Sequence, residues 1–451
     1  MAARRLNATD AYLIMQNLVK QATGETASIA EGDVSAYISA GEKVLSTGME
    51  NTLEALSIVL GRTLIAVRPY KARGSIVRAA NFNEYETRMR KISYYSDKAL
   101  PTGAWNTQVY TKNLETGRTN DEGPDNSGGT KDATKSMWEQ HPVIPLEMNF
   151  AGFDTWDEAV TFYKKQLKIA FRDPGEMAKF VNGMMIAKNN DIEMEKEAYD
   201  TMTLCGYMAA LFDAEAVLST GMAVNLTAEY NNFYGTSYTT DQLLTTYLKE
   251  FTGFFVAFVK TMVDDFARNT LKRHWSPAKT VNGVSLYLPR HTPKSDIKMV
   301  MYDPFWKKVE ATVMPEVFND EYLTFDNFES VTYWQSNTPG NQAKIDISPA
   351  LPDITGTHSG QQYKGNRVQL YYVLGAIFDK DACMTNHALD DADATPMEAR
   401  KKYYNMWWNF LKQSTIDLTE QGCLLYMADT TSGGKATFVD PSLLDGSITF
   451  Q

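Results

Sequence analysis

The chain has 451 residues, of which 43% are hydrophobic and 22% charged, as in folded globular proteins. Its length exceeds what a single hydrophobic core usually supports, so we expect several packed units. The 44 Lys and Arg residues against 55 Asp and Glu residues give a formal charge of −11, which excludes a generally basic, phosphate-binding protein.

Residues 1–67 are predicted to form a helical N-terminal arm. Two helical patches flank a loop of small residues at 23–32. The second patch places apolar residues three and four positions apart, namely Val44, Leu45, Met49, Leu53, Leu56 and Leu60. The segment then becomes β-rich before Pro69, so the arm is expected to enter a strand.

Residues 68–153 are predicted to form a long extended hairpin. Polar and aromatic residues alternate there, and the segment 120–134 is rich in turn-forming residues. Gly123, Gly128 and Gly129 would let this tip change shape at low steric cost. A two-stranded hairpin is only marginally stable alone, so we expect it to lie on a neighbouring molecule, although packing on its own chain is an alternative.

A long helix is predicted over about 173–212, within a unit at 154–224. Asp173, Pro174 and Glu176 have the pattern of a capped helix start. An apolar stripe follows, made of Phe180, Met184, Ala187, Met194, Ala198, Cys205, Met208 and Phe212. The opposite face, expected to be exposed, carries Lys179, Lys188, Glu193, Glu197 and Asp200.

Residues 225–385 alternate between helix and strand. Helices are expected near Tyr230 and over 240–268, and a strand at 297–303. The strand at 368–379 is apolar on both faces, so it should lie inside a covered sheet. Residues 386–451 should return to the unit at 154–224, with a helix or strand at 403–411 and a strand at 423–428.

Several segments resemble major capsid proteins of tailed bacteriophages of the Hong Kong 97 type. These are GEKVLSTGMENTLEALSIVLGRTLIAVRPY, FRDPGEMAKFVNGMM, MYDPFWKKVEATVMPEVFN and YYVLGAIFDKDACM. The order of the predicted elements is similar too: an N-terminal arm, an extended loop, a peripheral domain with a long spine helix, an axial domain and a return to the peripheral domain. The fold class expected from this resemblance is α+β.

The resemblance implies a subunit that assembles with itself into pentamers and hexamers of an icosahedral shell around double-stranded DNA. Portal, scaffold or decoration proteins would be further partners, without a membrane, and assembly would take place in the host bacterial cytoplasm. An acidic inner wall would keep the DNA from adhering. The expected inter-subunit contacts are Arg62, Arg68, Arg73, Tyr85, Arg88, Tyr94, Trp105, Tyr110 and Arg118.

The shell that gives this fold its name joins its subunits through a lysine–asparagine bond, and no such pair is evident in this sequence. Lysines of the predicted loop are expected to contact solvent, namely Lys91, Lys98, Lys112, Lys131 and Lys135. Alternatives are a portal, tail or encapsulin-like shell protein, or an enzyme with an unrecognised site.

No catalytic, cofactor-binding or metal site is predicted. Cys205, Cys383 and Cys423 match no metal or redox spacing and should be reduced and mostly buried. The histidines, His141, His274, His291, His358 and His387, are each expected at the surface. A solvated loop is favoured for Asp390, Asp391 and Asp393, and Trp407 and Trp408 are expected in a core or an interface. No signal peptide or membrane span is apparent, so the product is expected to stay in the cytosol.

Overall fold

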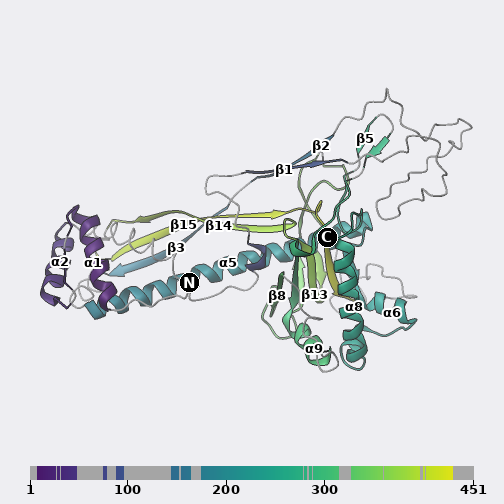
Figure 1. Cartoon of the computed structure of the whole chain (residues 1–451), viewed down its shortest axis with the longest axis horizontal. Coiled ribbons are helices and arrows are strands. Elements are labelled where there is room, and N and C mark those ends of the chain that lie inside the picture. The colour runs from purple at the N-terminus through teal and green to yellow at the C-terminus, as the bar shows by residue number, and fades with distance from the viewer. Residues whose placement is uncertain are drawn as a thin grey trace, which may run out of the picture.

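A computed structural model describes residues 8–47 except 27 and 31, 75–78, 88–95, 144–163 except 152 and 153, 174–313 except 278, 282, 283 and 287, and 327–429 except 359, 397–399 and 402. The molecule is elongated: a helical pair lies at one end, a long helix and a sheet form the middle, and a larger sheet with its helices forms the other end (Figure 1). The predicted α+β class is confirmed.

The helical pair at one end is α1 (Ala8–Thr23) and α2 (Val34–Ser46), as predicted. The side chain of Asp33 caps α2 by accepting a hydrogen bond from the Ala36 amide at 3.0 Å. Tyr12 and Tyr37 join the two helices with an edge-to-face ring contact whose centroids are 5.4 Å apart. The predicted continuation through residues 49–60 and the strand before Pro69 lie outside the described residues.

The base of the predicted hairpin is present. Strand β1 (Arg88–Tyr94) pairs antiparallel with β2 (Pro145–Ala151), so that Ile92 lies opposite Glu147 and Tyr94 opposite Pro145. This pairing confirms that the two ends of the predicted hairpin lie side by side as antiparallel strands. The predicted tip, residues 120–134, lies outside the described residues.

The long helix is α5 (Pro174–Leu218), whose 45 residues span about 67 Å. It ends six residues after the predicted end at 212. It runs along a three-stranded antiparallel sheet of β14 (Cys383–Ala394), β15 (Tyr403–Ile416) and β3 (Asp154–Tyr163). Its segment 186–218 is long and apolar enough to cross a membrane, but 67% of the apolar window is buried inside the protein, as in a core helix. Asp173, the predicted cap, lies outside the described residues.

The predicted faces of α5 are partly wrong. Cys205, Met208 and Phe212 are buried as expected, whereas Met194 is 62% exposed and Ala198 is also exposed. Two residues assigned to the exposed face, Glu193 and Asp200, are buried instead, and Ala187, assigned to the apolar stripe, is exposed. The reason is that Arg78 pairs with both carboxylates, so charged residues occupy the helix face that packs on the sheet. The side chains of Lys179 and Phe180 are not among those that the structure describes.

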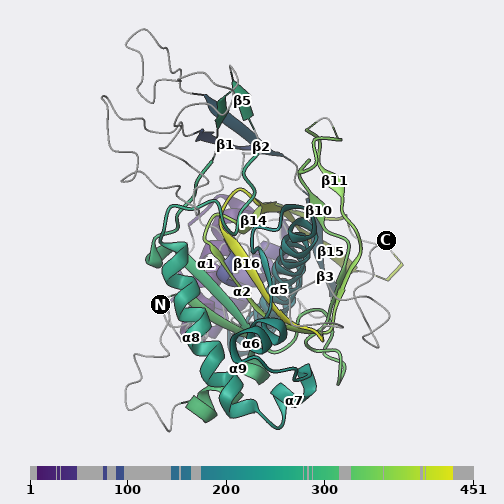
Figure 2. The same cartoon turned by 90° about the vertical axis from the view of Figure 1, so that its right-hand side faces the viewer.

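A five-stranded sheet forms the other end of the molecule, in the order β4 (Ala223–Asn225), β16 (Gly422–Met427), β13 (Tyr372–Asp379), β7 (Ile297–Tyr302) and β8 (Asn327–Val331). One face packs against α6 (Leu226–Tyr234), α8 (Leu248–Phe266) and α9 (Asp303–Val313). The other packs against the second half of α5 (Figure 2). The prediction of a strand covered on both sides is confirmed for 372–379, which form β13. Residues 368–370 form a separate strand, β12 (Val368–Leu370), which pairs with β9 (Ile345–Ile347) in a smaller sheet.

Strand β16 belongs by sequence to the last predicted unit, residues 386–451. In the structure it lies between β4 and β13, in the sheet that residues 223–379 build. The stretch 403–411, left open between helix and strand, is part of β15, where Trp408 is buried and Trp407 is 36% exposed. The smaller elements are α7 (Thr240–Leu244), η1 (Ser75–Val77), η3 (Lys294–Asp296), β5 (Lys279–Val281), β6 (Val284–Leu286), β9 (Ile345–Ile347), β10 (Ala350–Leu351), β11 (Tyr363–Lys364) and β12 (Val368–Leu370).

The three cysteines are buried and free, as predicted. Burial raises the pKa of the Cys383 and Cys423 thiols to about 12, so neither is a reactive thiolate near neutral pH. The surface position predicted for the histidines is wrong for His274 and His387, which are buried where their rings contact backbone or carboxylate oxygens. His291 and His358 are exposed as expected, and His141 lies outside the described residues.

Candidate assembly site

The hairpin base has one face turned to solvent. Along β1 the residues alternate: Arg90, Ile92 and Tyr94 are exposed, whereas Ser93 is buried and Lys91 is half-buried. Ile92 and Tyr94 are 46% and 61% exposed, which is unusual for large apolar side chains on neighbouring positions of one strand face. The strand therefore presents an apolar ridge to its surroundings and a polar face to the body of the molecule.

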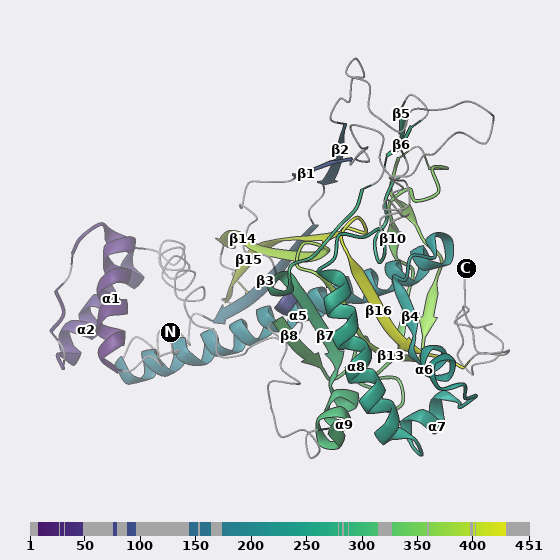
Figure 3. The same ribbon diagram turned by 45° about the vertical axis from the view of Figure 1, so that its right-hand side comes forward.

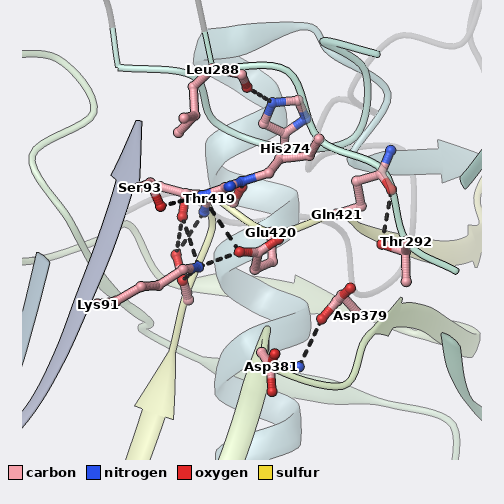
Figure 4. Close-up of polar contacts among 12 residues, drawn as sticks. Lys91, Ser93, His274, Leu288, Thr292, Asp379, Asp381, Thr419, Glu420 and Gln421 are labelled. Atoms are coloured by element: carbon pink, nitrogen blue, oxygen red, sulfur yellow. Dashed lines mark hydrogen bonds and ion pairs between the residues drawn. The ribbon is translucent and has the colours of Figure 1, made fainter. Parts of the chain in front are cut away.

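The inner face is tied to the body through Lys91. Its ammonium forms ion pairs with Asp417 and Glu420 and lies 3.3 Å from the Thr419 hydroxyl (Figure 4). The Asp417 side chain is only 1% exposed and the Lys91 side chain 21%, so this contact is largely removed from water. Two carboxylates around one ammonium form a strong local attachment, because charged hydrogen bonds strengthen away from solvent.

Arg290 makes the second attachment of β1. Its guanidinium donates to the Ser93 hydroxyl at 2.6 Å and to the Thr419 carbonyl oxygen at 3.1 Å, and lies 3.5 Å from a Glu420 oxygen. A single planar side chain thus connects the hairpin strand with the turn that contains Thr419 and Glu420. We call Lys91, Ser93, Arg290, Asp417 and Glu420 the hairpin anchor.

The sequence builds this turn locally. Asp417 accepts hydrogen bonds from both the amide and the hydroxyl of Thr419, at 2.8 and 2.7 Å, which is an Asx turn. The turn connects β15 of the three-stranded sheet with β16 of the five-stranded sheet. The hairpin is therefore anchored at the turn between the two sheets (Figure 3).

Buried polar contacts hold the segment that carries Arg290. The hydroxyl of Thr292 donates to the Gln421 side chain at 2.9 Å. The two ring nitrogens of His274 lie 2.7 Å from the Leu288 carbonyl oxygen and 3.0 Å from the Lys272 carbonyl oxygen. Burial lowers the pKa of His274 from its ordinary value. His274 thus connects residue 272 to residue 288, shortly before Arg290, and this role explains why the histidine is buried.

Of the nine residues predicted to contact neighbouring subunits, Tyr94 is the one whose side chain the structure describes, and it is exposed on β1 as a contact residue requires. Arg88 begins β1, and nothing further is described of its side chain. The other seven, Arg62, Arg68, Arg73, Tyr85, Trp105, Tyr110 and Arg118, lie outside the described residues.

The sequence-based interpretation missed the anchor itself. Lys91 was expected to contact solvent, but it is half-buried between two carboxylates. The alternation in RMRKISY indicates that residues 90, 92 and 94 share one face and 91 and 93 the other. No local pattern indicates that Asp417 and Glu420, more than 300 positions away, supply the partners.

Removing the Lys91 ammonium is expected to loosen the hairpin while leaving the two main sheets intact. In Lys91→Ala, Asp417 and Glu420 lose their ion pair, which should cost about 1–3 kcal/mol in local stability. Hydrogen exchange of the amides of residues 88–94 should accelerate, and exchange in β13 and β16 should not. Arg90→Ala is the matched control, since Arg90 lies on the outer face of the same strand and pairs with an exposed Glu147. Equal protection in both variants would contradict the anchor.

The described part of the chain offers no cluster of three or more His, Cys, Asp or Glu side chains that could hold a metal ion. The polar side chains of the anchor are paired with one another in attachment contacts. These contacts hold a hairpin with exposed apolar side chains on the body of the molecule.

A family model described as Phi29-like phage major capsid protein matches residues 151–426, more than half of the chain. No curated protein sequence matches significantly. A capsid structure of Staphylococcus phage Andhra is similar over 80% of this chain and 86% of that chain, with 10% identity and a TM-score of 0.45. A chain of the head fibre and inner core protein structure of bacteriophage P68 is similar over 78% and 83%, with 10% identity and a TM-score of 0.41. The capsid of cyanophage P-SCSP1u is similar over 80% and 89%, with 11% identity and a TM-score of 0.38.

Proposed function

The chain belongs to the family of Phi29-like phage major capsid proteins, and from this premise we propose that its copies form the pentamers and hexamers of an icosahedral shell of the Hong Kong 97 type around double-stranded DNA. Residues 1–67 would serve as N-terminal arm, 68–153 as extended loop, 154–224 and 386–451 as peripheral domain, and 225–385 as axial domain, with strand β16 of the last segment added to the axial sheet. The role is structural rather than enzymatic. The family match favours a shell subunit over a portal or tail subunit.

The observation that carries this proposal is the hairpin base, which is fastened on one face and uncovered on the other. A two-stranded sheet is marginally stable in water unless its apolar side is packed. Here the anchor secures the inner face, and Ile92 and Tyr94 remain exposed on the outer face. A neighbouring copy that covers this face would convert it into buried interface, with the aromatic residue as a contact point.

The layers of the molecule indicate where this contact falls. The hairpin β1–β2 lies on the side of the three-stranded sheet that faces away from α5 (Figures 1 and 3). Copies related by rotation about an axis normal to a shell keep their layers at the same height. The hairpin of one copy would thus reach over the three-stranded sheet of the next, where Trp407 is 36% exposed.

Packaged DNA, a portal and scaffold or decoration proteins would be the remaining partners, with assembly in the host bacterial cytoplasm. The net charge of −11 supports a shell that encloses DNA without adhering strongly to it.

The test is assembly of a variant in which the exposed face of the hairpin is made polar. Ile92→Ser combined with Tyr94→Ser should leave the far-ultraviolet circular dichroism and melting temperature of the subunit nearly unchanged, because both side chains are exposed. Particles counted by negative-stain microscopy after expression should fall at least about tenfold, since loss of an aromatic contact residue costs about 1–2 kcal/mol or more. Val217→Ser, at an equally exposed position of α5, is the control. Wild-type particle yield in the double variant would contradict the proposal.

A further inference from the structure

The middle of α5 carries an exposed stripe that the fold does not use. Asp191, the adjacent Met194 and Glu195, Ala198 and Met202 recur every three or four residues on the exposed side of the helix. Met194 and Met202 are each 62% exposed, and the stripe contains no lysine or arginine. The sheet of β14 and β15 packs on another face of the helix, and Ile192 is buried. The stripe is therefore an apolar surface with a negative charge and no cover within the described part of its own chain.

Helix α1 has a surface of complementary character. It packs on α2 and on α5 through buried residues such as Met15, Leu18 and Val19. Its other side exposes Leu13, 55% accessible, together with Asn17 and Lys20. This face is apolar at one end and positive at the other, and it lies at the end of the elongated molecule, where a neighbouring copy can reach it (Figure 1).

The two surfaces match in spacing as well as in charge. Leu13 and Lys20 are seven residues apart on α1, and Met202 and Glu195 are seven residues apart on α5, so each pair is separated by about 10 Å along its helix. The apolar residues meet and the charges meet only if the helices run in opposite directions. Ala198 lies between the two contact points and allows a close approach of the helices.

We propose that α1 of one copy docks antiparallel on the α5 stripe of a second copy, with Leu13 against Met202 and Lys20 against Glu195. This inference rests on the proposed shell function and adds a specific contact to it. It also accounts for the exposure of two methionines on a helix whose other side packs on a sheet. Each subunit would then be held by its hairpin on one layer and by its helical arm on another.

Cysteine cross-linking tests the contact. In particles assembled from the variant Leu13→Cys with Met202→Cys, mild oxidation should produce chains linked to one another on a non-reducing gel. The three native cysteines are buried and should not interfere. Leu13→Cys with Val217→Cys is the matched control, because Val217 is exposed but about 22 Å further along α5, beyond the reach of a disulfide.

The outcomes separate this contact from the shell function. Particles that form without the cross-link, or in which the Met202→Cys thiol links to a different virion protein, would overturn the contact and leave the function in place. Absence of particles from the unaltered chain would overturn both. Should the cysteine pair hinder folding, charge reversal serves instead: Lys20→Glu should lower the assembled fraction about fivefold, the equivalent of one exposed ion pair, and adding Glu195→Lys should restore it. Failure of that restoration would also overturn the contact.

Discussion

Replacing Gly375 by alanine is expected to disrupt the pairing of the central strands of the five-stranded sheet. Gly375 lies in β13, the central strand, at a point where the pairing with β16 shifts register. A Cβ atom added there would lie 2.3 Å from the Val300 carbonyl oxygen and 2.5 Å from the Met301 sulfur. The first of these atoms belongs to the backbone of the paired strand β7, so relief requires the strands to separate. The expected loss is about 3–5 kcal/mol, at the upper end of single-substitution effects.

The measurement is soluble yield together with thermal unfolding followed by circular dichroism. Gly253→Ala provides the matched control, because Gly253 is exposed in α8 and an added Cβ atom meets nothing within 4 Å. Alanine at that helical position should stabilise the protein by about 0.5–1 kcal/mol. If Gly375→Ala unfolded at the same temperature as the unaltered chain, the close pairing of β13 with β7 would be wrong.

The elements that sequence predicts well are those whose signals are local. Strand β16 is a continuous apolar run, and β7 is an apolar run interrupted by a single lysine. The helical pair at the N-terminal end follows from regular spacing of apolar residues. The base of the hairpin follows from alternation on either side of a turn-rich segment. Each of these features is decided by residues close together in the chain, so a single sequence contains the information.

The features that sequence does not predict depend on distant partners. Arg78 and Asp200 are 122 positions apart, and Lys91 and Asp417 are 326 apart. Without knowledge of those contacts, a charged residue is assigned to the surface, as happened for Glu193, Asp200 and Lys91. Conversely, methionines at helical spacing were assigned to the sheet side of α5, whereas Met194 is exposed. For the candidate site, pattern alone therefore identifies the hairpin but not its anchor.

A second substitution with a large expected loss of stability lies in a buried charge network around Arg78. The Arg78 guanidinium lies 2.6 Å from Asp200 and 3.0 Å from Glu193, and the Asp200 side chain is fully buried. Asp200 also accepts hydrogen bonds from the Thr385 hydroxyl at 2.6 Å and from His387 at 2.8 Å. Burial would lower the pKa of Arg78, but the two carboxylates raise it above its ordinary value. The network thus joins Arg78, the residue that follows η1, to the middle of α5 and to β14.

Arg78→Met should therefore destabilise the subunit by about 3–5 kcal/mol, because the fully buried Asp200 carboxylate loses its cation and Glu193 keeps only a longer contact with Lys196, at 3.7 Å. Methionine keeps much of the apolar stem, so the loss reports on charge rather than on packing. Asp200→Asn added to Arg78→Met should recover part of the stability, since it removes the fully buried charge and keeps a hydrogen-bonding side chain. Lys307→Met, which breaks an exposed pair with Glu310, should change unfolding by less than about 0.5 kcal/mol. The measurement is chemical denaturation of the unaltered chain and of the three variants. Equal midpoints for Arg78→Met and Lys307→Met would mean that the buried carboxylates on α5 do not depend on Arg78.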